Sequence, residues 1–181
     1  MKSMLLCFSC MLWITQSFTQ TFHPDDAAST IQFNIKNFGI NTTGTFKGLT
    51  GEMIVNEQDC SKDYFQVSVD AATINTGIAA RDHHLRSEDY FNVTTFPNIQ
   101  FISASVYQNK SDGICWVTGK LAIKGTTKVI SFPFEVMHTA MGFRLKGQFS
   151  INRLDYGVGS SSWVLANTVL VQLNVLAIPT P

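Results

Sequence analysis

Residues 143–151 read FRLKGQFSI, and this stretch shows the clearest alternation of apolar and polar side chains in the chain. Its two phenylalanines, its leucine and its isoleucine fall on one side of an extended backbone, because successive side chains of a strand point to opposite faces. The arginine, lysine, glutamine and serine fall on the other side. The pattern predicts a β-strand with one face in an apolar interior and the other in water.

Runs of the same period recur along most of the chain. Further runs begin at Ile31, Phe65, Ile99, Val117, Ile130 and Val169, and shorter ones occupy residues 45–49 and 52–55. Turn-forming residues at 109–113 and 124–127 separate some of them. We therefore expect an all-β protein of about eight or nine antiparallel strands. Such strands form a sandwich or a closed barrel, and an eight-stranded barrel has an interior that side chains fill or that holds a small ligand.

One segment breaks the alternation and predicts a short helix near residues 79–87. Within it, Asp82 and Arg86 stand four positions apart and would form an ion pair on one helix face. A helix of about two turns is not stable alone. We therefore expect it to dock against the strands.

The N-terminus has the features of a secretory signal peptide. Lys2 precedes an apolar stretch at residues 4–14, which is too short to cross a bilayer. We expect residues 1–20 to be cleaved, leaving one domain over residues 21–181 that is exported to a periplasm or the extracellular space. A buried core helix and a lipoprotein anchor at Cys10 are the alternatives.

Composition limits the partners. Charged residues make up 14% of the chain, with 13 basic and 13 acidic residues, and hydrophobic residues make up 45%. No run of lysine or arginine occurs, which argues against nucleic acid and against charge-driven binding to anionic lipid. Beyond the signal peptide, no apolar stretch is long enough for a transmembrane helix.

Two of the four cysteines, Cys7 and Cys10, lie in the predicted signal peptide, so the mature chain keeps Cys60 and Cys115. An exported compartment permits a disulfide, but the sequence does not show whether these two residues are within bridging reach. Both a bridge and free thiols remain open. The mature chain has no C-x-x-C motif, which argues against thiol-redox chemistry and a zinc ribbon.

Motifs of catalysis and metal binding are missing from the sequence. There is no G-x-S-x-G elbow, P-loop or dinucleotide-binding fingerprint. His83 and His84 are adjacent and would not converge on a metal ion. We expect neither an enzyme nor a metal site. An enzyme acting on lipid-like substrates is an alternative that would need titratable groups inside the barrel, and only the region of His84 and Arg86 offers them.

Several segments resemble the YceI-like, polyisoprenoid-binding domain family. In chain order they are GTFKGLTG (44–51), DAATINTG (70–77), RDHHLRS (81–87), DYFNV (89–93), FPNIQF (96–101), TGKLAIKGTTK (118–128) and INRLDYGVG (151–159). The resemblance covers roughly residues 28–178. It implies an extended lipocalin-like antiparallel barrel, a long internal pore for an isoprenoid or other long amphiphile, export, and carriage without catalysis. Asn37 departs from the family, in which many members carry a histidine there.

The apolar tube implied by the resemblance would be lined by the inward side chains of the alternating runs. These are Phe33, Ile35, Phe46, Val67, Val69, Phe101, Leu121, Phe132, Phe134, Phe143, Leu145, Phe149, Ile151, Val171 and Leu173. A bound isoprenoid or other long-chain lipid is the expected ligand, and no other cofactor is expected. The alternative is that the same side chains fill a solid core, in a secreted stress or adhesion module without ligand. A homodimer is left open.

Charged side chains near the helix are candidates for contacting a lipid headgroup. They are Arg81, Asp82, His84 and Arg86. An arginine there would suit a pyrophosphate or a quinone carbonyl, whereas the alternative is that these groups only dock the helix. Arg153, near Asp155, is a second candidate with a structural strand-end pair as its alternative.

Overall fold

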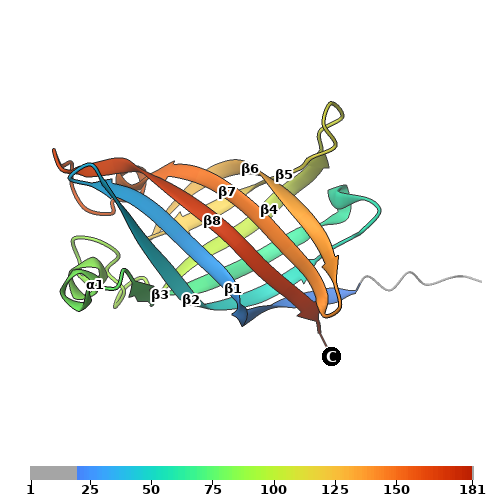
Figure 1. The fold of residues 1–181 in the computed structure, drawn as a ribbon, viewed down its shortest axis with the longest axis horizontal. Coiled ribbons are helices and arrows are strands. Elements are labelled where there is room, and N and C mark those ends of the chain that lie inside the picture. Colours follow the sequence, from blue (N-terminus) through green and yellow to red (C-terminus); the bar gives the residue numbers. More distant parts are fainter. Residues whose placement is uncertain (1–19, 181) are drawn as a thin grey trace, which may run out of the picture.

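A computed structural model describes residues 20–180, in which eight antiparallel strands close into a barrel (Figure 1). The strands are β1 (Thr21–Asn37), β2 (Ile40–Ile54), β3 (Tyr64–Asn75), β4 (Asn98–Gln108), β5 (Cys115–Ile123), β6 (Thr126–Thr139), β7 (Gly142–Asn152) and β8 (Leu165–Pro179). The helices are η1 (Cys60–Lys62), α1 (Ala79–Arg86) and η2 (Arg153–Tyr156). The predicted barrel is confirmed, and the short runs at 45–49 and 52–55 belong, except for the last residue of the second, to the single strand β2.

Residues 1–19 lie outside the described residues, and they hold all but the last residue of the predicted signal peptide. Within residues 20–180, none of the helices has the length and apolar character needed to cross a membrane.

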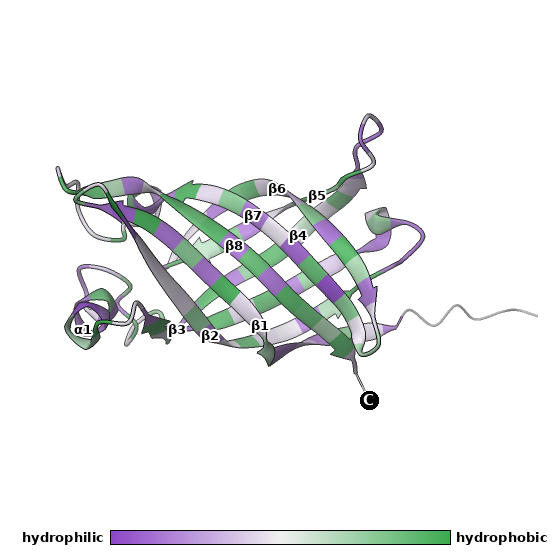
Figure 2. Ribbon diagram, in the orientation of Figure 1, coloured by the Kyte–Doolittle hydropathy of each residue, from purple (hydrophilic) through white to green (hydrophobic). Residues whose placement is uncertain are grey.

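Strand order around the barrel follows the chain, and β8 pairs with β1 to close it. Across this closure Phe33 of β1 stands opposite Val171 of β8, which stands opposite Phe149 of β7. Because side chains alternate with period two, this register turns all three toward the interior. Figure 2 shows the same alternation as bands of hydrophobic and hydrophilic residues along the strands.

A bulge in β1 interrupts the pairing with β8 at residues 25–30. Side chains satisfy backbone groups there: the Ser29 hydroxyl accepts from the Leu176 N–H at 3.0 Å, and the Asp26 carboxylate accepts from the Leu49 N–H at 2.8 Å. Bulges bend strands and help a sheet curve until it closes. The polar residues early in β1 therefore serve closure.

One end of the barrel has a solid aromatic core. Phe22 meets Phe143 with ring centroids 5.1 Å apart, and Phe65 meets Phe134 at 5.5 Å. All four side chains are buried. Apolar packing closes this end of the barrel to solvent.

At the opposite end lie α1, η2 and the β1–β2 hairpin, on the left of Figure 1. The predicted helix is confirmed, but the expected ion pair between Asp82 and Arg86 does not form. Arg86 donates to the carbonyls of Ala72 and Ile74, and Asp82 accepts from the backbone N–H of Thr76. Both side chains bind backbone at the end of β3, because a two-turn helix must be held by the structure beside it.

Cys60 and Cys115 form a disulfide with their Cα atoms 6.4 Å apart. The bond joins η1 to the start of β5 across a sequence separation of 55 residues. It therefore restricts a long loop of the unfolded chain.

The double variant Cys60→Ser, Cys115→Ser should lose about 4 kcal/mol of unfolding free energy, from the loop-closure entropy of a 55-residue loop. Urea unfolding measures the loss. A reducing agent should lower the stability of the wild type to that of the variant and leave the variant unchanged. Equal stability of the oxidised wild type and the variant would contradict the prediction.

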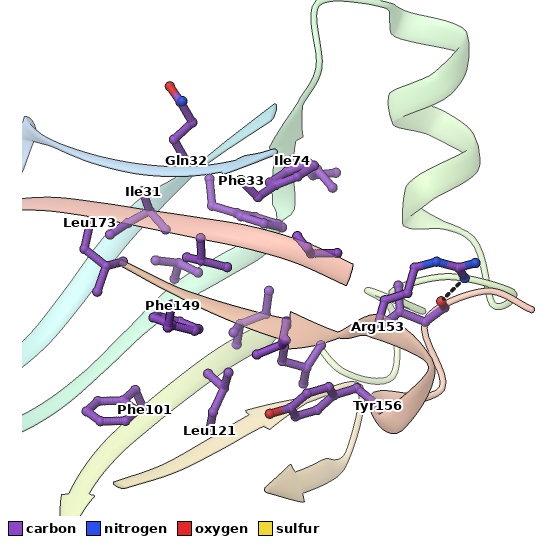
Figure 3. Close-up of a pocket in the computed structure, with 18 of the residues that line it drawn as sticks. Ile31, Gln32, Phe33, Ile74, Phe101, Leu121, Phe149, Arg153, Tyr156 and Leu173 are labelled. Atoms are coloured by element: carbon purple, nitrogen blue, oxygen red, sulfur yellow. Dashed lines mark hydrogen bonds between the residues drawn. The ribbon is translucent and has the colours of Figure 1, made fainter. Parts of the chain in front are cut away.

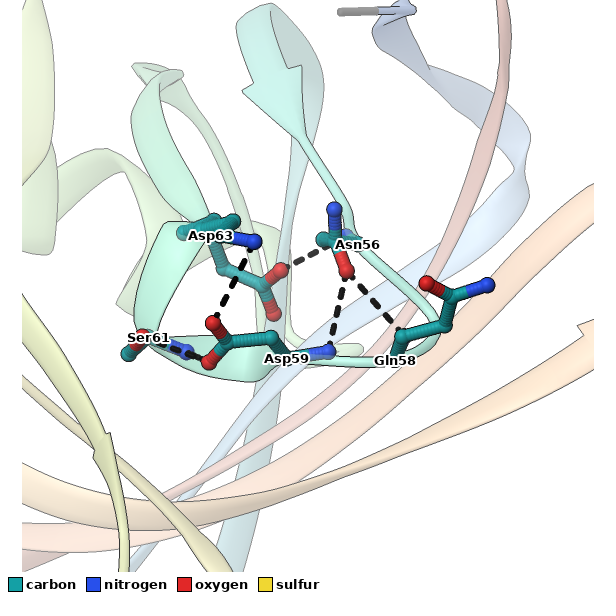
Figure 4. Close-up of polar contacts among 6 residues, drawn as sticks. Asn56, Gln58, Asp59, Ser61 and Asp63 are labelled. Atoms are coloured by element: carbon teal, nitrogen blue, oxygen red, sulfur yellow. Dashed lines mark hydrogen bonds and ion pairs between the residues drawn. The ribbon is translucent and has the colours of Figure 1, made fainter.

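Asp63, directly after η1, is a buried carboxylate with an incomplete set of partners (Figure 4). Its Oδ1 accepts from the backbone N–H of Asn56 at 2.7 Å, while Oδ2 has no hydrogen-bond partner within the described part of the chain. Burial raises the pKa of Asp63 to about 7, and the nearby Asp59 adds to the rise. The neutral acid is therefore the form that the folded state favours.

Stability should fall as pH rises because of Asp63. Its pKa is raised in the folded state, so its stabilising contribution is complete below about pH 4 and is lost as pH rises through about 7. Asp63→Asn keeps an acceptor for Asn56 without the charge. We expect the unfolding free energy of the variant, relative to the wild type, to increase by on the order of 2–4 kcal/mol from pH 4 to pH 8. A difference independent of pH in urea titrations would refute this.

Candidate ligand-binding site

The barrel encloses a cavity of about 460 Å³ (Figure 3), a volume typical of sites for small molecules. Most of the predicted apolar side chains line it. They are Phe33, Ile35, Phe46, Val67, Val69, Phe101, Leu121, Phe132, Phe134, Leu145, Phe149, Ile151, Val171 and Leu173. Phe143 does not line it, because it packs against Phe22 in the solid end of the barrel.

Other residues of the cavity wall were not predicted. Ile31, Phe65, Val117, Ile123 and Val175 line it, and their period-two spacing is the signal that could have identified them. A second set follows no strand pattern and consists of Leu85, Tyr90, Phe91 and Tyr156. They lie in α1, in the segment after it and in η2, and only the tertiary fold brings them to the barrel.

Two aromatic rings of the wall lie over glycines on the adjacent strand. A Cβ atom at Gly44 would stand 2.2 Å from Cζ of Phe33, and one at Gly119 would stand 2.6 Å from Cζ of Phe101. Any larger residue would displace these rings. The glycines let the rings lie against the sheet, which keeps the lumen open.

The interior of the barrel is hollow toward the end that holds α1. Phe33, Phe101 and Phe149 point inward yet are only half-buried, whereas Phe65 and Phe134 near the solid end are fully buried. A solid core would bury all five, as protein interiors are close-packed. The interior is therefore filled at one end and open at the other.

Exposed apolar side chains surround this open end. They are Phe38, Ile40, Ile78, Trp163 and Val164. The backbone N–H of Phe38 donates to the carbonyl of Val164 at 2.7 Å, which joins the β1–β2 hairpin to the loop before β8. Phe38 also has a positive φ of 51°, a conformation that bulky residues rarely adopt. An aromatic side chain is thus held in water at the rim of the cavity.

The four charged side chains predicted near the helix point in two different directions. Arg81 and His84 line the cavity, whereas Asp82 and Arg86 face the end of β3. Arg81 donates to the hydroxyl and the carbonyl of Thr76, at 2.7 and 2.8 Å. The cluster is split because residues one position apart on a helix point about 100° apart. Within residues 20–180, no three His, Cys, Asp or Glu side chains gather in a way that could hold a metal ion.

Arg153 lies at the same end and is almost fully buried. Its guanidinium donates to the carbonyls of Val158 and Ser160 at 2.8 Å and of Ala166 at 2.9 Å. Asp155 does not pair with it. Burial lowers the pKa of Arg153. The residue ties the loop after η2 to the barrel, and its donors are directed at that loop.

The sequence pattern that defines the YceI-like domain matches residues 22–177. The chain belongs to the YceI-like family. A UPF0312 protein of Photorhabdus laumondii is 37% identical over 109 residues, which are 59% of this chain and 55% of that protein. Protein YceI of Salmonella arizonae is 33% identical over 108 residues, 59% of this chain and 56% of the relative. The match thus spans about half the length of these relatives.

Solved structures share the barrel. BcnA of Burkholderia cenocepacia superposes with a TM-score of 0.78 at 23% identity, covering 84% of this chain and 98% of BcnA. A polyisoprenoid-binding domain from Saccharophagus degradans gives a TM-score of 0.67 at 19% identity, covering 89% and 99%. At these identities the likeness establishes a shared YceI-like fold.

Arg153 lies in η2, within the YceI-like signature INRLDYGVG (151–159). Substitutions of Arg153 can distinguish a structural role of this residue from contact with a lipid headgroup. Arg153→Lys retains the charge but cannot reach several carbonyls at once. We expect it to lose at least about 2–3 kcal/mol of unfolding free energy, because buried carbonyls lose donors. Arg86→Lys, at a more exposed pair of carbonyls, should cost about 1 kcal/mol.

Urea unfolding measures both losses, and amide hydrogen exchange should rise in the loop at residues 157–164 only in the Arg153 variant. Unchanged stability of Arg153→Lys together with weakened ligand binding would instead support the headgroup role.

Proposed function

We propose that this YceI-like protein is an exported binding or carrier protein that holds a long isoprenoid or fatty amphiphile inside its barrel. The observation that carries the proposal is the lumen, where inward-facing side chains such as Phe33, Phe101 and Phe149 are apolar but not fully buried. Covering such a surface with an apolar chain lowers the free energy, because apolar groups leave water. The structural likeness to a domain described as polyisoprenoid-binding supports this choice of ligand.

Export is supported by two independent features of the chain. Residues 4–14 have the length and composition of a signal-peptide core. The bridge between Cys60 and Cys115 is a bond that persists in oxidising compartments. A periplasm or the extracellular space satisfies both.

The shape of the open end supports entry of an apolar chain. The exposed side chains of Phe38, Ile40 and Trp163 stand at the rim, and exposed apolar patches mark interaction sites. A lipid tail that slides past them would stay in contact with apolar side chains while it moves into the lumen.

The polar side chains at the open end of the barrel favour binding without catalysis. Arg81 and Arg153 are bonded to neighbouring backbone and side-chain oxygens. His84 is exposed and packs edge-on against Tyr90. A reaction would need a base and an acid that converge on one substrate atom. A solid-cored module without ligand is disfavoured by the lumen itself.

Cavity size must set the length of the bound chain. Burial is worth roughly 0.8 kcal/mol per CH₂, so about forty carbons would sum to about 32 kcal/mol. That exceeds the limit of about 18–21 kcal/mol for non-covalent affinity. Ordering costs consume the excess, and affinity alone cannot discriminate among long chains.

Filling the lumen should abolish binding. Val171→Trp places an indole between Phe33 and Phe149, whereas Thr168→Trp on the same strand adds an indole to the outer face. We expect native mass spectrometry of gently purified wild type and of the Thr168 variant to show a bound lipid, and of the Val171 variant to show none. Geranylgeraniol added to delipidated wild type should raise its melting temperature, since a ligand that binds only the native state stabilises it. A folded wild type that carries no lipid and takes up no prenyl chain would overturn the proposed function.

A further inference from the structure

Tyr156 carries a buried hydroxyl that the fold does not use. Its side chain is 2% exposed, and its oxygen has no hydrogen-bond partner within residues 20–180. The residue ends η2 and lines the cavity. In Figure 3 its hydroxyl lies near Leu121, and its oxygen is covered by the side chains of the cavity wall.

The surroundings of this hydroxyl are apolar. Tyr156 packs in one cluster with Leu121, Ile123 and Val158. An unpaired hydroxyl in such a place is unfavourable, because it loses its bonds to water and gains none in exchange. Phenylalanine would fill the same ring volume without that cost. The hydroxyl is therefore suited to a partner that reaches it from the lumen when the apolar side chains over it move aside.

The chemistry of that partner follows from the charges nearby. Burial raises the pKa of Tyr156, and the neighbouring Asp155 adds to the rise, so the phenol stays protonated and can donate. The nearest buried cation in the sequence is Arg153, and its donors are directed at loop carbonyls. A phosphate at this position would be buried without a counter-charge, which is strongly unfavourable. A neutral oxygen carries no such cost.

We propose that Tyr156 donates a hydrogen bond to a neutral oxygen of the bound lipid, such as a carbonyl. The inference rests on the proposed function and adds a selectivity to it. The lumen prefers a chain that carries a neutral oxygen over a pure hydrocarbon, and it places that oxygen beside η2.

Three probes and two variants test this. The probes are geranylgeranylacetone (a ketone), squalene (a hydrocarbon) and geranylgeranyl pyrophosphate, each titrated into delipidated full-length protein. Tyr156→Phe removes only the hydroxyl, and Tyr107→Phe removes a hydroxyl from an exposed site on β4 as the matched control.

We expect Tyr156→Phe to weaken ketone binding about 3- to 10-fold, the range of one buried hydrogen bond, and to leave squalene binding unchanged. The ligand-free variant should melt at a higher temperature than the wild type, because an unpaired buried hydroxyl is gone. The infrared carbonyl stretch of bound ketone should lie at lower frequency in the wild type and in Tyr107→Phe than in Tyr156→Phe.

Two results would overturn the inference. Ketone and squalene affinities that are both unchanged would mean that a buried water or nothing pairs with the hydroxyl. If Tyr156→Phe lost the same affinity for all three probes, Tyr156 would act through packing and not through its hydroxyl. If the wild type binds none of the probes, the proposed function itself fails, which is a separate outcome.

Discussion

The hydrogen-bonded pairing of β1 with β8 is the constraint on which the other features of the molecule depend. It joins strands from the two ends of the described chain and removes the free edges of the sheet. Closure also fixes which side chains share the interior, since Phe33, Val171 and Phe149 meet across three strands only in this register. The bulge at residues 25–30 supplies the curvature that closure requires.

Closure alone does not decide whether a barrel is full or hollow. Here that depends on where large rings lie relative to small residues. Gly44 and Gly119 receive the rings of Phe33 and Phe101 against the sheet, whereas Phe22 and Phe143 cross the other end and fill it. The result is a tube with one solid end and one open end.

Hydrogen bonds from buried or half-buried side chains hold both sides of the open end. Arg153 donates to four backbone carbonyls and to the side-chain oxygen of Asn167, and so fixes the loop between η2 and β8. The helix α1 is held at the end of β3 by Arg86, which donates to the carbonyls of Ala72 and Ile74, and by Asp82 and Arg81, which each form two hydrogen bonds with Thr76. Local stability follows the number of such buried contacts. Both η2 and α1 are therefore tied to the strands at this end of the barrel.

The sequence by itself determined the strand-built fold, the short helix and most of the apolar wall, because period-two alternation is a local property that any inward-facing strand must show. Family signatures extended this to the YceI-like barrel. Tertiary structure alone decided the separation of Phe143 from the lumen, the split between Arg81 and Arg86, and the bond between Cys60 and Cys115. It also brought Tyr156 to the cavity, from a segment without alternation. These outcomes depend on which distant residues pack together when the barrel closes, and no local pattern encodes that distance.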